Sequence, residues 1–171
     1  MAIDLAHYIE ALKRNMSVIA GLCAGVAAAQ AHWRPAEDAW SITEVVCHLR
    51  DEEREDFRTR VDFTLHRPDA DWPPIDPTGW VYARAYNDQL LPHVLNECLS
   101  EREASITWLR GLKEPNWEST HSNPRGTLRA GDVLAAWLAH DYLHIRQLNA
   151  LRYLWHVRAS QPYLADYAGD W

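Results

Sequence analysis

The sequence predicts an all-α fold, a four-helix bundle formed by residues 1–171 as a single domain. A chain of 171 residues can bury one sizeable core but is too short for two comfortable domains. The seven glycines and nine prolines are few and clustered, so long stretches keep an uninterrupted three-four spacing of apolar residues. Four amphipathic stretches of about 25 residues each pack most simply as a bundle.

Composition and charge exclude several classes of protein. Apolar residues make up 47% of the chain and charged residues 24%, a balance typical of globular rather than disordered proteins. The net charge of −7 argues against binding to nucleic acid or to an anionic membrane. No apolar run approaches the roughly 20 residues that span a bilayer, and the N-terminus does not resemble a secretory signal. Since the three cysteines have no framework spacing, we expect reduced thiols in a cytoplasmic protein.

Apolar spacing and helix propensity identify three of the four predicted helices. The first covers residues 4–31, and its second part is rich in alanine. The third covers residues 81–112 and contains Pro92, which either kinks this helix or marks a restart. The fourth covers residues 130–157. All three stretches are long enough to contribute to one bundle core.

The second predicted helix begins at a recognisable cap. Ser41 takes the N-cap position and Glu44 lies three residues later, which is the spacing of a capping box. Trp40 precedes the cap and can pack on Val45 as a hydrophobic staple. The helix is expected to end at His66, before a proline.

Two long connectors separate the predicted helices. Residues 67–80 hold four prolines and one glycine, which argue against regular structure. Residues 113–127 form the second predicted loop. Connectors of this length suggest that not every consecutive pair of helices forms a tight antiparallel hairpin. Four aromatic residues near the first connector either cover a pocket or belong to the core: Trp72, Trp80, Tyr82 and Tyr86.

The fourth predicted helix carries His140 and His144, whose rings project from one helical face because they are four residues apart. Two imidazoles at this spacing can bind one metal ion, but nine histidines in the chain make a chance pair common. Both lie on an apolar stripe that includes Trp137 and Leu151, so we expect them to face the core. Unpartnered buried polar groups cost about 1–3 kcal/mol each. The pair therefore binds either a metal or carbonyls and carboxylates of the core.

The second predicted helix supplies a third inward-facing histidine. His48 lies three residues after Val45 and beside Leu49, on the apolar face of the helix. Taken alone, His48 is better explained as a histidine of the core or of a helix interface. Three histidines from two helices, however, form a ligand set that leaves a fourth position for water or substrate, as in catalytic zinc sites.

Two carboxylates follow His48 and are weaker candidates for catalysis. Asp51 and Glu52 lie three and four residues later, so either can share its face. Glu52 is a candidate fourth ligand, general base or orienting hydrogen-bond partner, although considered alone it fits a partly solvated residue of an acidic run better. Asp141 points about 100° away from the preceding histidine and favours a salt bridge between helices. Gln147 can hydrogen-bond near the site.

Two sequence patterns resemble the DinB/YfiT-like superfamily of bacterial metalloenzymes. The run W-S-I-x-E-V-V-x-H-L-x-D-x-E begins at Trp40, and H-D-x-x-H-x-x-Q-L begins at His140. The segment W-P-P-I-D-P-T-G-W-V-Y-A-R-x-Y-N, which begins at Trp72, is similar to one branch of the superfamily. The resemblance covers residues 4–155, which is most of the chain.

The resemblance implies a bundle with up-down-down-up connectivity and a divalent metal held by His48, His140 and His144. Zinc and nickel both suit imidazole ligands. It also implies a homodimer, which fits the 11% aromatic content, because interfaces are rich in Trp and Tyr. Characterised members of the superfamily include transferases and isomerases that use low-molecular-weight thiols.

These observations together predict a metal-dependent transferase that delivers a small thiol to an electrophilic small molecule. A metal held by neutral imidazoles can stabilise a thiolate or lower the pKa of bound water to about 7. Two alternatives remain open, namely a non-catalytic protein that binds a metal or small ligand, and a hydrolase that uses a metal-bound hydroxide. A pocket of roughly 300 Å³ or more at the histidines favours an enzyme or a ligand binder.

Overall fold

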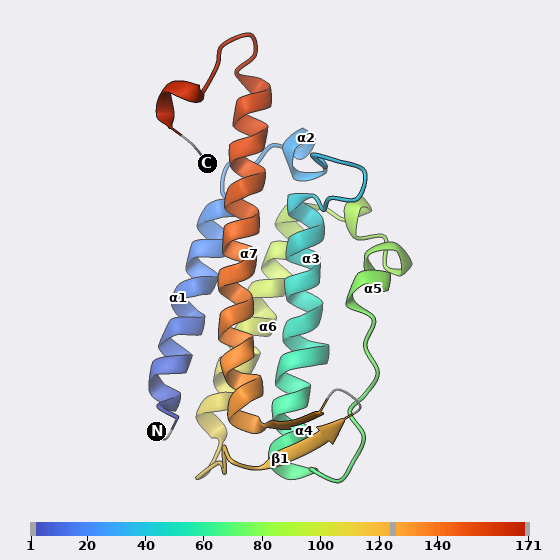
Figure 1. The fold of residues 1–171 in the computed structure, drawn as a ribbon, viewed down its shortest axis with the longest axis vertical. Coiled ribbons are helices and arrows are strands. Elements are labelled where there is room, and N and C mark those ends of the chain that lie inside the picture. Colours follow the sequence, from blue (N-terminus) through green and yellow to red (C-terminus); the bar gives the residue numbers. More distant parts are fainter. Residues whose placement is uncertain (1–2, 124–125, 170–171) are drawn as a thin grey trace.

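Four long helices form a bundle in the computed structural model, which describes residues 3–123 and 126–169. The chain rises, descends, descends again and rises, so the bundle has the predicted up-down-down-up connectivity (Figure 1). This confirms the all-α four-helix bundle. The helices that begin its four segments are α1 (Leu5–Cys23), α3 (Ile42–Glu52), α6 (Leu91–Gly111) and α7 (Ala130–Ala159).

The first helix is shorter than the predicted range of residues 4–31. Asp4 caps α1 by accepting a hydrogen bond from the backbone N–H of His7. Shortly after α1 ends, Gly25 adopts a φ of 68°, a left-handed conformation that glycine adopts readily and that turns the chain. A separate short helix, α2 (Ala28–Ala31), follows. The helix propensity of alanine therefore did not extend α1 through this turn.

The predicted capping box starts α3. The Ser41 hydroxyl accepts a hydrogen bond from the backbone N–H of Glu44 at 3.2 Å, and the Glu44 carboxylate accepts one from the backbone N–H of Ser41 at 2.8 Å. Arg34 donates through Nε to the same carboxylate at 2.9 Å. Trp40 packs against the apolar cluster that includes Val45. These contacts fix the end of the helix that carries His48.

The second helical segment ends at His66, as predicted, but contains an unpredicted wider turn. A π-helix, η1 (Glu53–Arg58), joins α3 to α4 (Thr59–His66). Two consecutive residues at this junction, Glu52 and Glu53, are both buried. A π-turn is frequent at functional sites and shifts the face that following side chains present.

The first connector contains more regular structure than predicted. Residues 67–80 were expected to lack it, but α5 (Pro77–Ala83) begins within this range. The reason is local, because Asp76 accepts a hydrogen bond from the backbone N–H of Gly79 at 3.0 Å and a proline suits the first turn of a helix. A short 3₁₀ turn, η2 (Tyr86–Asp88), follows.

The third long helix starts later than residue 81, where the sequence predicted it. Ala85 adopts a φ of 46° after α5, so the chain turns before α6 begins. Pro92 lies in the first turn of α6, where its missing N–H is not needed for an intrahelical hydrogen bond. Pro92 therefore marks the start of a new helix and does not kink a continuous one.

The second connector carries two short strands in place of the predicted loop of residues 113–127. β1 (Thr120–Asn123) and β2 (Gly126–Arg129) pair antiparallel, with His121 opposite Leu128. Strands of four residues leave too little alternation to be recognised from sequence. Beyond the hairpin, α7 begins at the predicted residue, and a 3₁₀ turn, η3 (Asp166–Ala168), follows it near the C-terminus.

The core is divided into two apolar clusters by a layer of buried polar residues. One cluster joins the C-terminal part of α1 to the N-terminal part of α3, and the other joins the N-terminal part of α1 to η1 and α4. Arg102 lies between them, 2% exposed, and its guanidinium pairs with Glu53 and Asp141. The salt bridge predicted for Asp141 is thus present. Trp137 donates to Glu53 at 2.9 Å and completes this layer.

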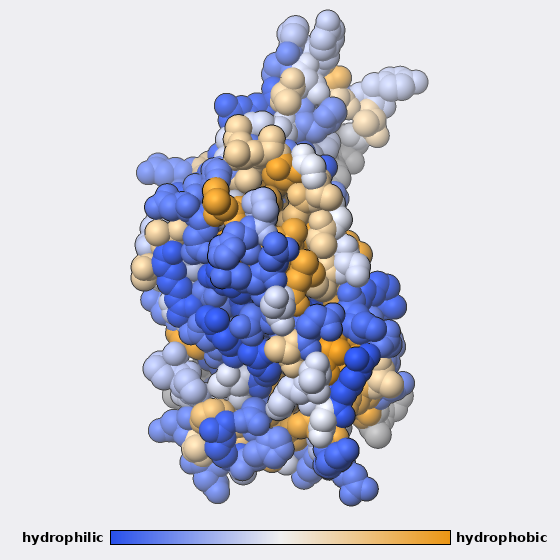
Figure 2. Space-filling model, turned by 180° about the vertical axis from the view of Figure 1, so that it is seen from behind, coloured by the Kyte–Doolittle hydropathy of each residue, from blue (hydrophilic) through white to orange (hydrophobic). Residues whose placement is uncertain are grey.

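The outer surface carries both hydrophilic and hydrophobic regions. Seen from behind, one side of the bundle is largely hydrophilic, and hydrophobic residues gather in a strip beside it (Figure 2). Several large apolar side chains are half exposed or more, among them Tyr142 and Leu143 of α7. In the described part of the chain, none of the helices is both long and apolar enough to cross a membrane.

Candidate metal centre

Three histidine rings meet between α3 and α7, at the level of the polar layer. Nε2 of His140 lies 3.0 Å from Nε2 of His144 and 3.3 Å from Nε2 of His48. The three potential ligand atoms all lie within 4.8 Å of one another. Among the described residues, no other group of histidine, cysteine or acidic side chains has the spacing to hold a metal ion. The fold thus brings together the three histidines selected from the sequence.

Two helical pairs of residues account for this convergence. His140 and His144 are four residues apart on α7, and His48 and Glu52 are four residues apart on α3. Side chains at this spacing lie on one face, one turn apart. Because α3 and α7 are neighbours that run in opposite directions (Figure 1), the two pairs face each other across the helix interface.

Glu52 is the carboxylate that reaches the histidines. Its Oε2 lies 3.1 Å from Nε2 of His140 and 3.8 Å from Nε2 of His48, and the side chain is only 7% exposed. Burial acts to raise the pKa of Glu52, but the hydrogen bond with His140 and the other imidazoles outweigh it, so the pKa lies below its ordinary value. The sequence, with Glu52 considered alone, favoured a partly solvated residue of an acidic run. The structure shows instead that Glu52 is buried.

Asp51 lies in a separate network and does not face the three histidines. Tyr86 donates to its Oδ2 at 2.7 Å, Arg84 donates to the same atom at 2.6 Å, and Arg50 donates to Oδ1 at 2.7 Å. Burial opposes ionisation, yet these donors hold the pKa of Asp51 below its ordinary value. The network ties α3 to the connector around α5, so Asp51 has a structural role.

The imidazoles of His48 and His144 are held in their neutral form. Burial lowers the pKa of His48 to about 4 and that of His144 to about 3, and the neighbouring His140 acts in the same direction. Nδ1 of His144 lies 2.7 Å from Oε1 of Gln147, which only accepts hydrogen bonds. Nδ1 therefore carries the proton, and the lone pair of Nε2 points toward the other two rings.

Aromatic rings wall the site. The ring of Trp40 meets that of His48 edge to face at 4.9 Å between centroids, and Phe57 lies 4.9 Å from His140. Neither contact was predicted, because Trp40 was assigned only to the helix cap and Phe57 lies within the unpredicted π-helix. These walls limit the access of water to the three nitrogen atoms.

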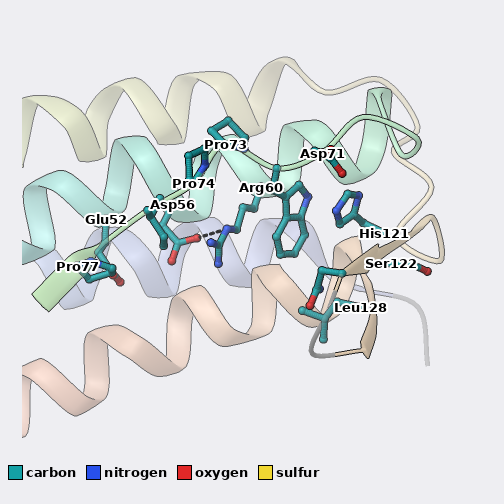
Figure 3. A pocket seen from close by; sticks show the side chains of 13 residues that line it. Glu52, Asp56, Arg60, Asp71, Pro73, Pro74, Pro77, His121, Ser122 and Leu128 are labelled. Carbon is teal, nitrogen blue, oxygen red and sulfur yellow. Dashed lines mark ion pairs between the residues drawn. The ribbon is translucent and has the colours of Figure 1, made fainter. Parts of the chain in front are cut away.

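A cavity of about 690 Å³ extends from Glu52, which contacts His140, toward the hairpin. Figure 3 shows Glu52 and Pro77 at one end and His121, Ser122 and Leu128 at the other. Three elements far apart in the sequence form it, namely the helix from α3 to α4, the first connector and the hairpin. Its volume is that of a typical small-molecule site.

Ionic and aromatic side chains meet in the middle of this cavity. Nε of Arg60 lies 2.8 Å from Oδ1 of Asp56, and burial raises the pKa of Asp56 to about 6. The guanidinium lies over the Trp72 ring, which in turn stacks on His121. The sequence placed Trp72 near a possible pocket but gave no indication of Arg60 or His121, which are distant in the chain.

A second cavity, of about 450 Å³, reaches His144 from the other direction along the bundle. It is lined by the turn before α3 and by the C-terminal half of α7, whereas the first cavity lies toward the opposite end of α3. Its walls include Trp40, Gln147, Leu151 and Leu154 and are largely apolar.

The cysteines lie outside the candidate centre. Cys23, Cys47 and Cys98 are all free and buried. Burial raises the pKa of Cys23 to about 11 and that of Cys47 to about 12, and it raises that of Cys98 further. The thiols are therefore un-ionised at neutral pH and poor nucleophiles.

Comparison with known proteins identifies the family of this chain. The family model of the DinB superfamily matches residues 11–148. The chain belongs to the DinB superfamily. This match includes all three histidines, and it confirms the family that the sequence patterns of α3 and α7 resemble.

Solved structures share the DinB fold. YfiT from Bacillus subtilis, described as a probable metal-dependent hydrolase with an unusual four-helix bundle topology, matches with a TM-score of 0.78 and 15% identity, over 90% of this chain and 89% of that chain. A mycothiol-dependent maleylpyruvate isomerase matches with a TM-score of 0.65 and 15% identity. That match covers 85% of this chain and 61% of the isomerase. At these identities the likeness establishes the bundle topology.

Proposed function

We propose that His48, His140 and His144 hold a divalent metal ion and that the protein is a metal-dependent enzyme acting on small molecules. The support comes from the donor atoms. Nε2 of His144 presents a lone pair to the other rings, and Glu52 presents a carboxylate oxygen to His140. A single proton on His140 cannot satisfy all of these facing acceptors, whereas a cation can. Nδ1 of His48 is also buried without a hydrogen-bond partner, so only the contacts at Nε2 account for the burial of this ring.

Zinc and nickel are the proposed ions, since both suit imidazole nitrogen. When bound by neutral imidazoles, a divalent cation favours a thiolate over a thiol and makes bound water more acidic. Three histidines leave room for an exogenous group, which is typical of catalytic rather than structural sites.

We propose that the reaction is transfer of a low-molecular-weight thiol to an electrophilic small molecule. The observation that carries this proposal is the pair of cavities, one ending at Glu52 and one at His144. Transfer of a thiol to an electrophile requires binding sites for two organic reactants. Hydrolysis uses water as the second reactant, which needs no cavity of this size. The likeness to an isomerase described as mycothiol-dependent supports the use of a low-molecular-weight thiol.

The side chains around the centre have separate roles in this proposal. Oε2 of Glu52 accepts the proton that the thiol loses, because it lies beside the imidazole nitrogens and is kept ionised by them. Gln147 orients His144 through its Nδ1–H. Trp40 and Phe57 restrict water, which would compete with the thiol for the electrophile.

Hydrolysis is the second candidate, because a carboxylate at Glu52 can also take a proton from water. The likeness to YfiT, described as a probable metal-dependent hydrolase, favours it. A non-catalytic protein that binds a metal or a small ligand is the remaining alternative, and only an activity screen separates it from the enzymes.

The test begins with metal analysis of protein purified without nickel resin. His48→Ala, His140→Ala and His144→Ala should each lose most of the bound metal, while His93→Ala, a change at an exposed residue of α6, should retain it. Unchanged metal content in one of the three would remove that residue from the proposed site.

A screen of thiols against electrophiles then tests the reaction. Thiol-dependent turnover by the wild type and by a variant without cysteines supports transfer without a protein nucleophile. Turnover that needs no thiol supports hydrolysis. Loss of turnover with Cys47→Ala while the metal stays bound would assign the nucleophile to the protein.

A further inference from the structure

One wall of the larger cavity is a row of charged residues along a single helical segment. Glu52, Asp56 and Arg60 follow at intervals of four residues from the end of α3 to α4, and all three line the cavity. The row runs along the cavity from Glu52 at one end, beside His140, to Arg60, whose guanidinium lies next to Asp56 (Figure 3).

Arg60 is held in place by contacts that leave its terminal nitrogens free. Its Nε pairs with Asp56 at 2.8 Å, and its guanidinium carbon lies 4.7 Å from the ring centroid of Trp72. The Nε contact is a close ion pair without hydrogen-bond geometry, and no hydrogen bond joins the terminal nitrogens to any residue that the structure describes. Two parallel donors on an oriented guanidinium match the two oxygens of a carboxylate.

The remaining walls of the cavity are mostly apolar. A hydrocarbon chain or an aromatic ring can lie against these apolar side chains between Glu52 and Arg60. The apolar side chains come from the connector and the hairpin: Trp72, Pro73, Pro74, Ile75, Pro77 and Leu128.

We propose that this cavity binds an elongated small molecule whose carboxylate pairs with the terminal nitrogens of Arg60 and whose reactive end lies at Glu52. The assignment rests on the proposed function, because it names the substrate class of that site. The charges along the row set the direction of binding, since Glu52 repels a carboxylate and Arg60 attracts it. Asp56 already pairs with Nε of Arg60, and exposed Asp71 lies at the outer end, beside His121 (Figure 3).

The first experiment measures thiol binding to cobalt-loaded wild-type protein by absorption spectroscopy. The probes are 8-mercaptooctanoate, 8-mercaptooctanol, 8-aminooctane-1-thiol and the short 3-mercaptopropanoate. The long carboxylate should bind at least about tenfold more tightly than the long alcohol, because hydrogen bonds to a charged group are the stronger ones. It should also bind more tightly than the short carboxylate, which cannot reach Arg60. Tightest binding of the amine would overturn the proposal in favour of a cationic ligand.

The second experiment compares variants of two similar arginines. Arg60→Gln should remove the preference for the carboxylate, and Arg60→Lys should keep part of it, because the charge remains but the fork of donors is lost. Arg67→Gln is the matched control, since Arg67 also lies over an aromatic ring and pairs with Asp62 but does not line the cavity. Loss of the preference in the control would overturn the proposal.

A third experiment separates this inference from the proposed function. Calorimetry of metal-free protein with octanoate should give binding that Arg60→Gln weakens about tenfold. If octanoate binds in this way but no thiol reaches the cobalt, the anion site stands and thiol transfer fails. If thiols bind the cobalt but octanoate binding is absent or independent of Arg60, the anion site fails and thiol transfer stands.

Discussion

Oε2 of Glu52 lies 3.1 Å from Nε2 of His140, on the facing helix of the bundle. The contact joins the acidic end of α3 to the histidine pair of α7 and lies where the larger cavity ends. A carboxylate in this position can accept a proton from a reactant without leaving the neighbourhood of the imidazoles.

Replacing Glu52 tests this role. Glu52→Gln keeps the shape of the side chain but removes its basic oxygen, so turnover should fall by about 10²–10⁴-fold, the usual contribution of a general base. Most of the metal should remain, because the histidines are intact. Glu103→Gln, a change at an exposed residue of α6, is the control for the loss of one charge. Full turnover by Glu52→Gln would remove Glu52 from the mechanism.

Gln147 should control the orientation of His144. Gln147→Leu removes the acceptor of the Nδ1 proton, and loss of such an orienting partner typically lowers metal affinity by about 10–100-fold. Gln147→Glu retains an acceptor and should preserve most of the affinity. Competition with a chromogenic chelator measures both values. Equal affinities of the wild type and Gln147→Leu would show that the hydrogen bond does not matter for metal binding.

The stability of the metal-free protein should fall as the pH drops from about 6.5 toward 4. The pKa of His48 is about 4 in the fold and that of His144 about 3, against 6.5 for a free histidine, so the unfolded chain binds more protons in this window. Full stability is therefore present above pH 6.5. Asp56, with its pKa raised to about 6, acts in the opposite sense but is a single group.

Urea unfolding of chelator-treated protein at pH 7.5 and pH 5 measures this effect. The midpoint should be lower at pH 5, and the difference should shrink when His48 and His144 are both replaced by Gln. The added stability of the metal-loaded protein should also decrease below about pH 6, because protons compete for the imidazoles. A midpoint that rises between pH 7.5 and pH 5 would contradict the prediction.

Arg102 should be essential for the stability of the bundle. Its guanidinium binds Glu53 and Asp141 with four hydrogen bonds of 2.8–2.9 Å and donates to the backbone carbonyl of Leu12 at 2.8 Å. Arg102→Met leaves two buried carboxylates without a cation and should lower the free energy of unfolding by about 3–5 kcal/mol.

A matched change on the same helix isolates the effect of burial. Arg110 is 54% exposed and makes a long ion pair of 3.6 Å with Glu10, so Arg110→Met should change the free energy of unfolding by less than about 1 kcal/mol. Denaturant titration of both variants checks the difference. Similar losses in the two would mean that the buried network contributes little.

We also propose that two copies of the chain associate. Tyr142 and Leu143 on α7 are 52% and 53% exposed, and exposed large apolar groups are typical of surfaces that bind another protein. Light scattering should give about twice the chain mass of 19.7 kDa at micromolar concentration. A monomer mass at every concentration would refute the dimer.

The candidate centre could be predicted from sequence because its parts obey helical spacing. His140 with His144, and His48 with Glu52, are pairs four residues apart, and local geometry alone places each pair on one face. The capping box at Ser41 and the resemblance to the DinB superfamily were equally local. The helix boundaries could not be predicted in the same way. A single turn at Gly25 or Ala85 separates two helices where helix propensity predicts one continuous helix.

Only the tertiary structure decided between Glu52 and Asp51, and only it assembled the cavity. The two carboxylates are neighbours in sequence, and their roles diverge because the packing of α3 directs Glu52 to α7 and Asp51 to Tyr86 and Arg84. Arg60, Trp72 and His121 meet although they are far apart in the chain, because the connector and the hairpin both fold against α4. Helical periodicity is a local property that sequence carries, whereas contacts between distant segments depend on how the whole core packs.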